Sequence, residues 1–271
     1  MIGKSAVLCG AGRMGLAMAK GWFADLAAAG LSHVSIVDPM PSEAAKELAV
    51  SPQAALNPAQ PAPVDVMILA IKPQMLIQAA DSVKAWIGPQ TLVISVLAGV
   101  TLERLEDELG ANRVVRTMPN TPGAVGAGVT AYCLSKACSS EDQAMVDGLL
   151  KPLGAVEGPL DESLMDAVTV VSGSGPAYAF LLVESMAAAG VALGLEPEMA
   201  QRLARQTVIG AGVLMDQDPT SAEDLRKAVT SPNGVTQAAL EVMMADGAVP
   251  DVFKVALAAA EQRSKDLSRG D

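Results

Sequence analysis

The chain has 271 residues, of which 51% are hydrophobic and only 3% aromatic, so Ala, Val, Leu and Met must supply most of its core. That length suits one large domain or two modest ones. A formal net charge of −11 and the lack of a basic run argue against a nucleic-acid-binding protein. No uninterrupted apolar run reaches the roughly 18 residues of a membrane span, and the N-terminus lacks a signal-peptide pattern. We therefore expect neither nucleic acid nor membrane as a partner.

The cysteine and histidine content narrows the chemistry. Cys9, Cys133 and Cys138 are an odd, unclustered set, which predicts neither a metal site nor a disulfide framework and indicates a reducing, cytoplasmic setting. His33 is the only histidine, and we predict that it lies on a surface loop before a strand. An enzyme with this sequence is expected to work without a histidine acid or base, which argues against a Ser-His-Asp triad.

A glycine-rich turn, Gly-Ala-Gly-Arg-Met-Gly at residues 10–15, follows an apolar strand pattern at 5–9 and precedes a helical pattern at 16–23. This context makes the spacing a dinucleotide fingerprint. The first glycine permits the tight turn, the second lets backbone approach a pyrophosphate, and the third lets helix pack close to strand. The phosphates are expected at the amides of the helix N-terminus. The alternative is a glycine-rich turn without a ligand.

The second predicted strand, residues 34–37, ends at Asp38. An acidic residue about 20 positions beyond the glycines accepts hydrogen bonds from the adenosine ribose and repels a 2′-phosphate. Asp38 alone therefore favours NADH over NADPH. The alternative is that Asp38 only caps the next helical segment, residues 42–48.

The rest of the N-terminal half alternates between strand and helix patterns, which is typical of a mostly parallel α/β sheet. We predict an irregular crossover at 51–63, strands at 64–71, 91–96 and 114–118, a last strand at 126–133, and helices at 75–86 and 141–150. Lys72 follows the strand at 64–71, which puts a cation at the carboxyl edge where ligands bind in such sheets.

Strand patterns stop near residue 160, so we predict an α/β domain at 1–160 and an all-helical domain at 161–271. Its helices are expected at 164–171, 177–193, 197–215, 222–229, 237–245 and 250–267. Small residues at 187–190 would allow close helix contact. Helices this rich in Ala and Met leave much apolar surface to cover, which predicts self-association. The alternative is a compact monomeric bundle.

Two breaks interrupt the predicted helices, at residues 172–178 and 229–236. Pro176 is expected to begin a new helix after the first break, which would leave nearby amides free for a ligand. The hydroxyls and amides of the second break form a plausible carboxylate cradle without arginine. Ordinary capping and chain reversal is the alternative for each.

These motifs together closely resemble those of pyrroline-5-carboxylate reductases, nearly end to end. They are, in chain order, residues 10–15, Ala-Ile-Lys-Pro-Gln at 70–74, Ala-Gly-Val-Thr at 98–101, Arg-Thr-Met-Pro-Asn-Thr-Pro at 116–122, residues 172–178 and the family signature at 229–236. The glycine turn alone is weak, whereas the three later runs are specific in combination.

The resemblance implies an α/β N-terminal Rossmann-type dinucleotide-binding domain followed by an all-α C-terminal dimerisation domain, assembled as a dimer or a dimer-based higher oligomer. It implies reduction of the cyclic imine of L-1-pyrroline-5-carboxylate to L-proline by hydride from NADPH or NADH. With Asp38, which its position after the second strand predicts, the expected cofactor residues are Gly10, Ala11, Gly12, Arg13, Met14, Gly15, Asn57, Ala70, Ile71, Lys72, Pro73, Ala98 and Asn120. The substrate residues are Glu162, Ser174, Ser231, Gly234, Val235 and Thr236, with Thr236 as catalytic positioner and candidate proton relay.

The sequence departs from the family pattern at three positions. Asn233 replaces the first glycine of the usual Pro-Gly-Gly, and Asn tolerates positive φ better than other non-glycine residues. Val235 stands where a small residue or Thr is usual, which narrows the expected pocket. Asp38 stands where many relatives carry Ser, Asn or Arg for the 2′-phosphate, so the expected NADPH preference is open.

Three other functions compete with this interpretation. β-Hydroxyacid dehydrogenases share the glycine turn and a helical second domain, but their catalytic lysine has no counterpart in residues 172–183. A related imine reductase acting on another ring is the closer enzyme alternative. A non-catalytic dinucleotide-binding protein is the third, because fold alone does not determine function.

Overall fold

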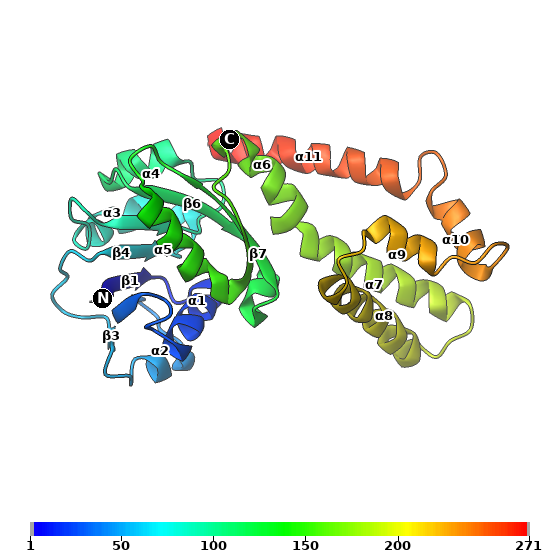
Figure 1. Ribbon diagram of the computed structural model, residues 1–271, viewed down its shortest axis with the longest axis horizontal. Helices are drawn as coiled ribbons and strands as arrows, with labels where there is room; N and C mark the ends of the chain where they lie inside the picture. Colours follow the sequence, from blue (N-terminus) through cyan, green and yellow to red (C-terminus); the bar gives the residue numbers. More distant parts are fainter. Residues whose placement is uncertain (1–2, 270–271) are drawn as a thin grey trace. The chain divides into compact units, whose positions relative to one another are not determined.

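The computed structural model describes residues 3–269, drawn in Figure 1. The chain packs as two units. The first comprises Met1–Gly173 and Glu261–Asp271, and the second comprises Ser174–Ala260. By packing, residues 161–173 therefore group with the N-terminal half, while the boundary predicted at residue 160 from the loss of strand patterns stays a prediction.

The first unit is built on an eight-stranded sheet with the order β3-β2-β1-β4-β5-β6-β7-β8. The strands are β1 (Lys4–Cys9), β2 (Leu31–Val37), β3 (Ala54–Leu56), β4 (Val66–Leu69), β5 (Leu92–Ser95), β6 (Val114–Pro119), β7 (Gly128–Leu134) and β8 (Gly154–Glu157). Every pairing is parallel except that of β6 with β7. The predicted mostly parallel sheet is confirmed.

Helices cover both faces of this sheet, and Figure 1 shows α1 and α5 apart from α3 and α4. They are α1 (Arg13–Ala24), α2 (Glu43–Leu48), α3 (Leu76–Lys84), α4 (Leu102–Leu109), α5 (Ser140–Leu150) and α6 (Met165–Val168). Alternate residues of β1 enter two separate cores: Ala6 and Leu8 pack with Trp22, whereas Val7 packs with Leu76. A parallel strand buried on both faces must be apolar throughout, which explains the unbroken apolar runs of the central strands.

Four details differ from the sequence-based expectations. The predicted crossover at 51–63 contains the short strand β3, and β8 follows the strand expected to be the last. Both are short edge strands without a long apolar run, so their pattern is weak. Helix α4 was not predicted, although Thr101 caps its start and Gly110, with φ +65°, ends it. His33 lies within β2 rather than on a loop.

The second unit is helical, as predicted. It contains α7 (Gly175–Ala192), α8 (Pro197–Gln217), α9 (Ala222–Ala228), α10 (Val235–Met243) and the beginning of α11 (Val249–Arg269). Helices α7 and α8 approach closely at small residues, since a Cβ built on Gly190 would lie 3.3 Å from that of Ala200. Among the residues described in this unit, only the small side chains of Ala200 and Ala204 are buried hydrophobics.

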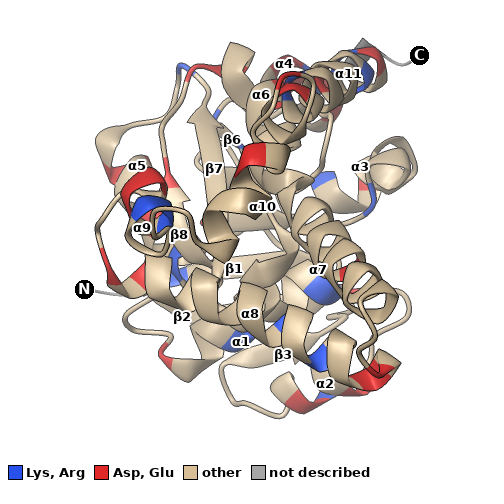
Figure 2. Cartoon of the chain, turned by 90° about the vertical axis from the view of Figure 1, so that its right-hand side faces the viewer, with Lys and Arg blue, Asp and Glu red and all other residues tan. Residues whose placement is uncertain are grey.

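Large apolar side chains of the second unit are correspondingly exposed. In Figure 2, α7, α8 and α10 are mostly tan, the colour of residues other than Lys, Arg, Asp and Glu. The helical stretch Glu162–Ala192 is, by length and composition only, apolar enough to cross a membrane. This differs from the expectation based on uninterrupted apolar runs, because Ser and Pro residues interrupt the run but not the helix. An apolar helix covered by another protein chain passes the same test.

Candidate active site

The carboxyl ends of four parallel strands meet at one edge of the sheet. Strands β1, β4, β5 and β6 are neighbours in that order, and all four are parallel. The Ala70 amide donates to the carbonyl of Cys9 at 2.7 Å, which continues the ladder into the loops. The loops that follow these strands begin at Gly10, Ala70, Val96 and Asn120, so the structure brings most of the predicted cofactor residues together.

The glycine turn has the geometry that a phosphate-binding turn needs. Gly10 has φ +96°, and a Cβ there would lie 2.5 Å from the carbonyl oxygen of Ala70. A Cβ on Gly15 would meet the Gly10 carbonyl oxygen, whereas a Cβ on Gly12 would have no neighbour within 4 Å. Gly12 is the N-cap of α1, and no side chain caps that helix end. The open space and the uncapped helix N-terminus suit a pyrophosphate.

The thiol beside this turn is chemically inert. Cys9 is the last residue of β1, and burial raises its pKa to about 12. A thiol with so high a pKa is a poor nucleophile at neutral pH. This end of β1 therefore provides shape and backbone groups rather than covalent chemistry.

Asp38 is held against the glycine turn. Its Oδ2 accepts a hydrogen bond from the Ala11 amide at 2.7 Å, and its Oδ1 accepts one from the Met40 amide at 2.8 Å. Helix α2 is instead capped by Ser42, whose side chain accepts from Ala45. The alternative that Asp38 merely caps this helix is therefore wrong.

Asn57 fixes the same loop from the other side. It is one of two described non-glycine residues with positive φ, at +45°. Its Oδ1 accepts from the Asp38 amide at 2.9 Å, and its Nδ2 donates to the Asp38 carbonyl at 2.8 Å. The side-chain amide of Asn57 thus holds the backbone on both sides of Asp38, while the Ala11 and Met40 amides orient the carboxylate.

The segment after β4 presents a cation. Lys72 is exposed and precedes the short 3-10 turn η1 (Pro73–Met75). In the described part of the chain, Lys72 forms no ion pair. An unpaired ammonium at the carboxyl edge is suited to an anionic ligand.

Glu162 belongs to the sheet unit and lies beside the start of α4. It begins the 3-10 turn η4 (Glu162–Leu164). Its Oε1 accepts from the Leu102 amide at 2.8 Å and from Arg116 Nη1 at 2.9 Å. Leu102 is four residues beyond Ala98. The carboxylate of Glu162, a predicted substrate residue, therefore lies next to a segment predicted to line the cofactor.

Asn120 forms internal bonds with both ends of its side-chain amide. Its Nδ2 donates to the Ser172 carbonyl at 3.2 Å, and its Oδ1 accepts from the Val129 amide at 3.0 Å. It therefore links the end of β6 to β7 and to the residues that lead into α7. Its assignment to the cofactor stays a prediction, and the contacts give it a bridging role in addition.

The first predicted break is a widened helical turn rather than a chain reversal. Residues Thr169–Gly173 form the π turn η5, and α7 resumes at Gly175 with Pro176 in its first turn. The sequence predicted free amides near Pro176. The Ala177 amide instead donates to the Ser174 carbonyl, so it is not free for a ligand. Proline lacks the donor that a first-turn position would leave unpaired, which is why the helix tolerates it here.

The second break is a tight turn before α10. The Gly234 amide donates to the Ser231 carbonyl at 3.0 Å, and the Asn233 amide donates to Gln237 Oε1 at 2.7 Å. Asn233 has φ +58°, which confirms that asparagine supports the positive φ expected of this loop. Gly234 is the N-cap of α10, and Val235 is 91% exposed. The exposed turn and the first amides of α10 are compatible with a carboxylate ligand.

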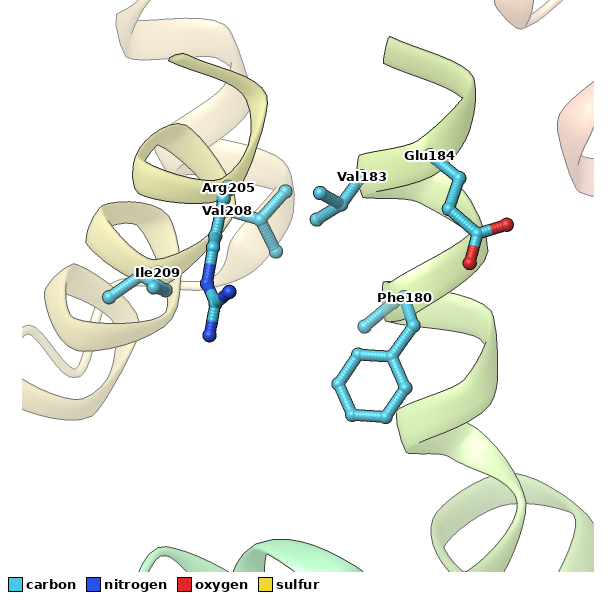
Figure 3. A pocket seen from close by; sticks show the side chains of 7 residues that line it. Phe180, Val183, Glu184, Arg205, Val208 and Ile209 are labelled. Carbon is cyan, nitrogen blue, oxygen red and sulfur yellow. The ribbon is translucent and has the colours of Figure 1, made fainter. Parts of the chain in front are cut away.

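A groove of about 390 Å³ lies between α7 and α8, and none of the residues that line it is a predicted site residue. Figure 3 shows Phe180 and Val183 from α7 facing Val208 and Arg205 from α8 across it. The lining is mainly apolar, which suits protein contact better than a charged cofactor. Within the described residues, no group of three His, Cys, Asp or Glu side chains could hold a metal ion.

The chain matches two family models and many named relatives. Residues 162–267 match the model "Pyrroline-5-carboxylate reductase dimerisation", and residues 4–99 match "NADP oxidoreductase coenzyme F420-dependent". A pyrroline-5-carboxylate reductase of Arabidopsis thaliana is 38% identical over 76% of this chain and 74% of its own. The chain belongs to the pyrroline-5-carboxylate reductase family.

Solved structures of the family agree over nearly the whole chain. A pyrroline-5-carboxylate reductase from Coxiella burnetii is 29% identical with a TM-score of 0.87, covering 97% of this chain and 98% of that one. One from Plasmodium falciparum with NADP bound is 26% identical with a TM-score of 0.73, covering 98% of each chain. The predicted Rossmann-type domain and helical dimerisation domain are confirmed.

The family match also accounts for the apolar helices. The dimerisation model covers 162–267, which includes the whole stretch that passes the length and composition test for a membrane span. Large exposed side chains such as Phe180 and Leu181 fit burial against another copy better than a compact monomeric bundle. The prediction of self-association is supported.

The contacts of Glu162 with Arg116 and with the Leu102 amide were not predicted from the sequence.

Proposed function

We propose that this chain reduces the cyclic imine of L-1-pyrroline-5-carboxylate to L-proline with a hydride from NAD(P)H, the final step of proline synthesis. The observation that carries this proposal is the agreement with pyrroline-5-carboxylate reductases over 97% of the chain. The placement of Glu162 beside the loop after β5 adds support from this chain's own contacts.

The reaction asks for orientation more than for acid–base chemistry. A cyclic imine, especially when protonated, is already electrophilic at the carbon that accepts the hydride. The protein needs to hold two rings at reacting distance and to exclude water. A chain whose only histidine lies in β2 is compatible with that requirement.

The cofactor proposal rests on the carboxyl edge of the sheet. When bound, the nicotinamide cofactor supplies the hydride. The space above Gly12 and the uncapped start of α1 fit its pyrophosphate, with Arg13, Met14 and Lys72 close in sequence to the same loops. Ala70, Ile71, Pro73 and Ala98 follow β4 and β5 and would line the rest of the cofactor.

Asp38 supports a preference for NADH. The carboxylate is oriented by the Ala11 and Met40 amides, and Asn57 holds its backbone, so it is a fixed anion at the end of β2. A fixed anion accepts ribose hydroxyls and repels a 2′-phosphate. NADP is bound in the Plasmodium falciparum relative, whereas we expect this chain to favour NADH.

The substrate proposal assigns the carboxylate of the imine acid to the turn before α10. Val235 and Thr236 offer amides at a helix N-terminus, Gly234 is the N-cap of that helix, and Ser231 adds a hydroxyl. Thr236 acts as the catalytic positioner and relays a proton through its hydroxyl. Glu162 and Ser174 are the other residues that the family resemblance assigns to the substrate.

The proposed enzyme works as a dimer or a dimer-based oligomer in the cytoplasm, without nucleic acid or membrane. The exposed apolar side chains of α7 and α8 support burial against another copy. Three free cysteines, two of them buried, are compatible with a reducing compartment.

The test is oxidation of reduced nicotinamide with and without pyrroline-5-carboxylate, with proline identified as the product. Turnover that depends on this imine supports the proposal. Turnover only with an imine of another ring size favours a related imine reductase. Cofactor binding without turnover favours a non-catalytic dinucleotide-binding protein.

A further inference from the structure

A buried arginine of β6 holds Glu162. Arg116 is 5% exposed, and its Nη1 donates to Glu162 Oε1 at 2.9 Å. In the described part of the chain, this is the ion pair that Arg116 forms. The two residues are 46 positions apart, so the pair joins the middle of the sheet to the turn η4.

The surroundings of Arg116 leave Glu162 as its counter-charge. Arg116 lies between Ser95 on β5 and Cys133 on β7, and neither carries a charge at neutral pH. Burial, followed by the charge of Glu162, raises the pKa of the Cys133 thiol to about 12. A buried guanidinium is costly without a carboxylate partner. The arginine therefore constrains where the Glu162 carboxylate lies.

One oxygen of Glu162 makes both protein contacts. Oε1 accepts from Arg116 and from the Leu102 amide at the start of α4, where the helix dipole also favours an anion. Within the described residues, Oε2 accepts no hydrogen bond, and the side chain remains 33% exposed. The geometry thus immobilises one oxygen and leaves the other available to a ligand.

We propose that Arg116 is a positioning residue for the reaction: with the Leu102 amide, it orients the Glu162 carboxylate so that Oε2 faces the cationic ring nitrogen of the protonated imine. This inference rests on the function proposed above. A preoriented anion stabilises the charged, electrophilic form of the ring without reorganising when the ring binds. Arg116 itself does not touch the substrate.

Three single variants of Arg116 and Glu162 test this proposal. Arg116→Met fills the buried volume without a guanidinium, Arg116→Lys keeps a cation, and Glu162→Gln keeps an acceptor for the Leu102 amide. Each is compared with wild type for kcat and for KM of pyrroline-5-carboxylate and of NADH. Thermal unfolding reports on folding, and the double variant Arg116→Met with Glu162→Gln measures the coupling.

We expect Arg116→Met and Glu162→Gln each to raise the KM of the imine about tenfold, with the KM of NADH changed less than about twofold. The double variant is expected to be no worse than Glu162→Gln alone, and Arg116→Lys to recover most of the loss. A purely structural arginine would instead lower stability and impair both substrates together, which would overturn the proposal. Independent, multiplying effects of the two variants would also overturn it. A wild type inactive on the imine would refute the proposed function, and this inference with it.

Discussion

The Asp38 carboxylate accepts a hydrogen bond from the Ala11 amide at 2.7 Å, which ties the end of β2 to the glycine turn. The side-chain amide of Asn57 bonds to both the backbone N–H and the backbone carbonyl of Asp38. A carboxylate held in this way cannot rotate away from the 2′-phosphate of NADPH. Cofactor preference is therefore expected to follow this residue.

Asp38→Ser removes the anion and keeps a hydroxyl acceptor. We expect kcat/KM with NADPH to rise about tenfold, because like-charge repulsion of the 2′-phosphate disappears, while kcat/KM with NADH falls. Steady-state kinetics with both cofactors measures the ratio. Ser42→Ala, which removes the cap of α2 and leaves Asp38 in place, is the control and should not change the preference. An unchanged ratio in Asp38→Ser would remove Asp38 from the account.

Thr236→Ala tests the catalytic assignment. We expect turnover to fall by about one to two orders of magnitude, the usual scale for loss of an oriented polar contact in proton transfer. Thr236→Ser keeps the hydroxyl and should retain most of the activity. Wild-type turnover in Thr236→Ala would show that this hydroxyl plays no part in the reaction.

The positive φ of Asn233 predicts an asymmetric response to substitution. Asn233→Gly should preserve stability, since glycine adopts this conformation without a Cβ penalty. Asn233→Ala should lower the free energy of unfolding by about 1 kcal/mol, because alanine lacks the short polar side chain that lets asparagine adopt the left-handed region. Both substitutions keep the backbone amide that donates to Gln237, so denaturant unfolding isolates the conformational effect. Equal stability of the two variants would contradict it.

The ion pair of Arg113 and Asp142 predicts how stability depends on pH. Asp142 is buried and accepts from Arg113 Nε at 3.1 Å and from the Ser139 amide at 2.9 Å. Burial alone would raise the pKa of Asp142, but the Arg113 hydrogen bonds and the Ser139 amide outweigh it and lower that pKa. A lowered carboxyl pKa contributes stability above its unfolded value of about 3.9, and this contribution is lost as the pH falls through the folded value.

Asp142→Asn should therefore lower the free energy of unfolding by about 2 kcal/mol at neutral pH. The difference from wild type should shrink as the pH falls below about 4, where the wild-type carboxyl also takes up its proton. The exposed Asp81→Asn on α3 is the matched control and should show neither effect. A pH-independent difference for Asp142→Asn would contradict the role given to the charge.

The exposed face of α7 predicts the assembly. Leu181 is 60% exposed, and Leu181→Glu should shift the protein towards monomers because it puts a charge into the apolar contact. Ile77→Glu, on the equally exposed Ile77 of α3, is the control and should leave the mass unchanged. Light scattering during size-exclusion chromatography measures both. A dimer of unchanged mass in Leu181→Glu would place the contact elsewhere.

The sequence predicted the central elements because their patterns are strong. The buried strands β1, β4 and β5 are unbroken apolar runs, and the glycine turn carries its own backbone requirements. The short edge strands β3 and β8 bury little and leave only a weak pattern. The π turn before α7 was equally invisible, because a Gly-Ser run is as compatible with a widened turn as with a break.

The contacts of the site were harder to foresee than its residues. The partners of Glu162 are 46 and 60 positions away along the chain, and no local pattern couples them. An arginine within the apolar β6 was a usable signal, since a buried cation demands a carboxylate partner. The family resemblance gave Asn57 as a cofactor residue. Its contact with Asp38 depends on the pairing of β2 with β3, which the sequence did not predict.

The central claim is tested most directly by steady-state reduction of pyrroline-5-carboxylate by the wild-type protein with NADH and with NADPH. We expect proline formation with both cofactors and a higher kcat/KM with NADH. Failure of the imine to accelerate oxidation of either cofactor would contradict the account.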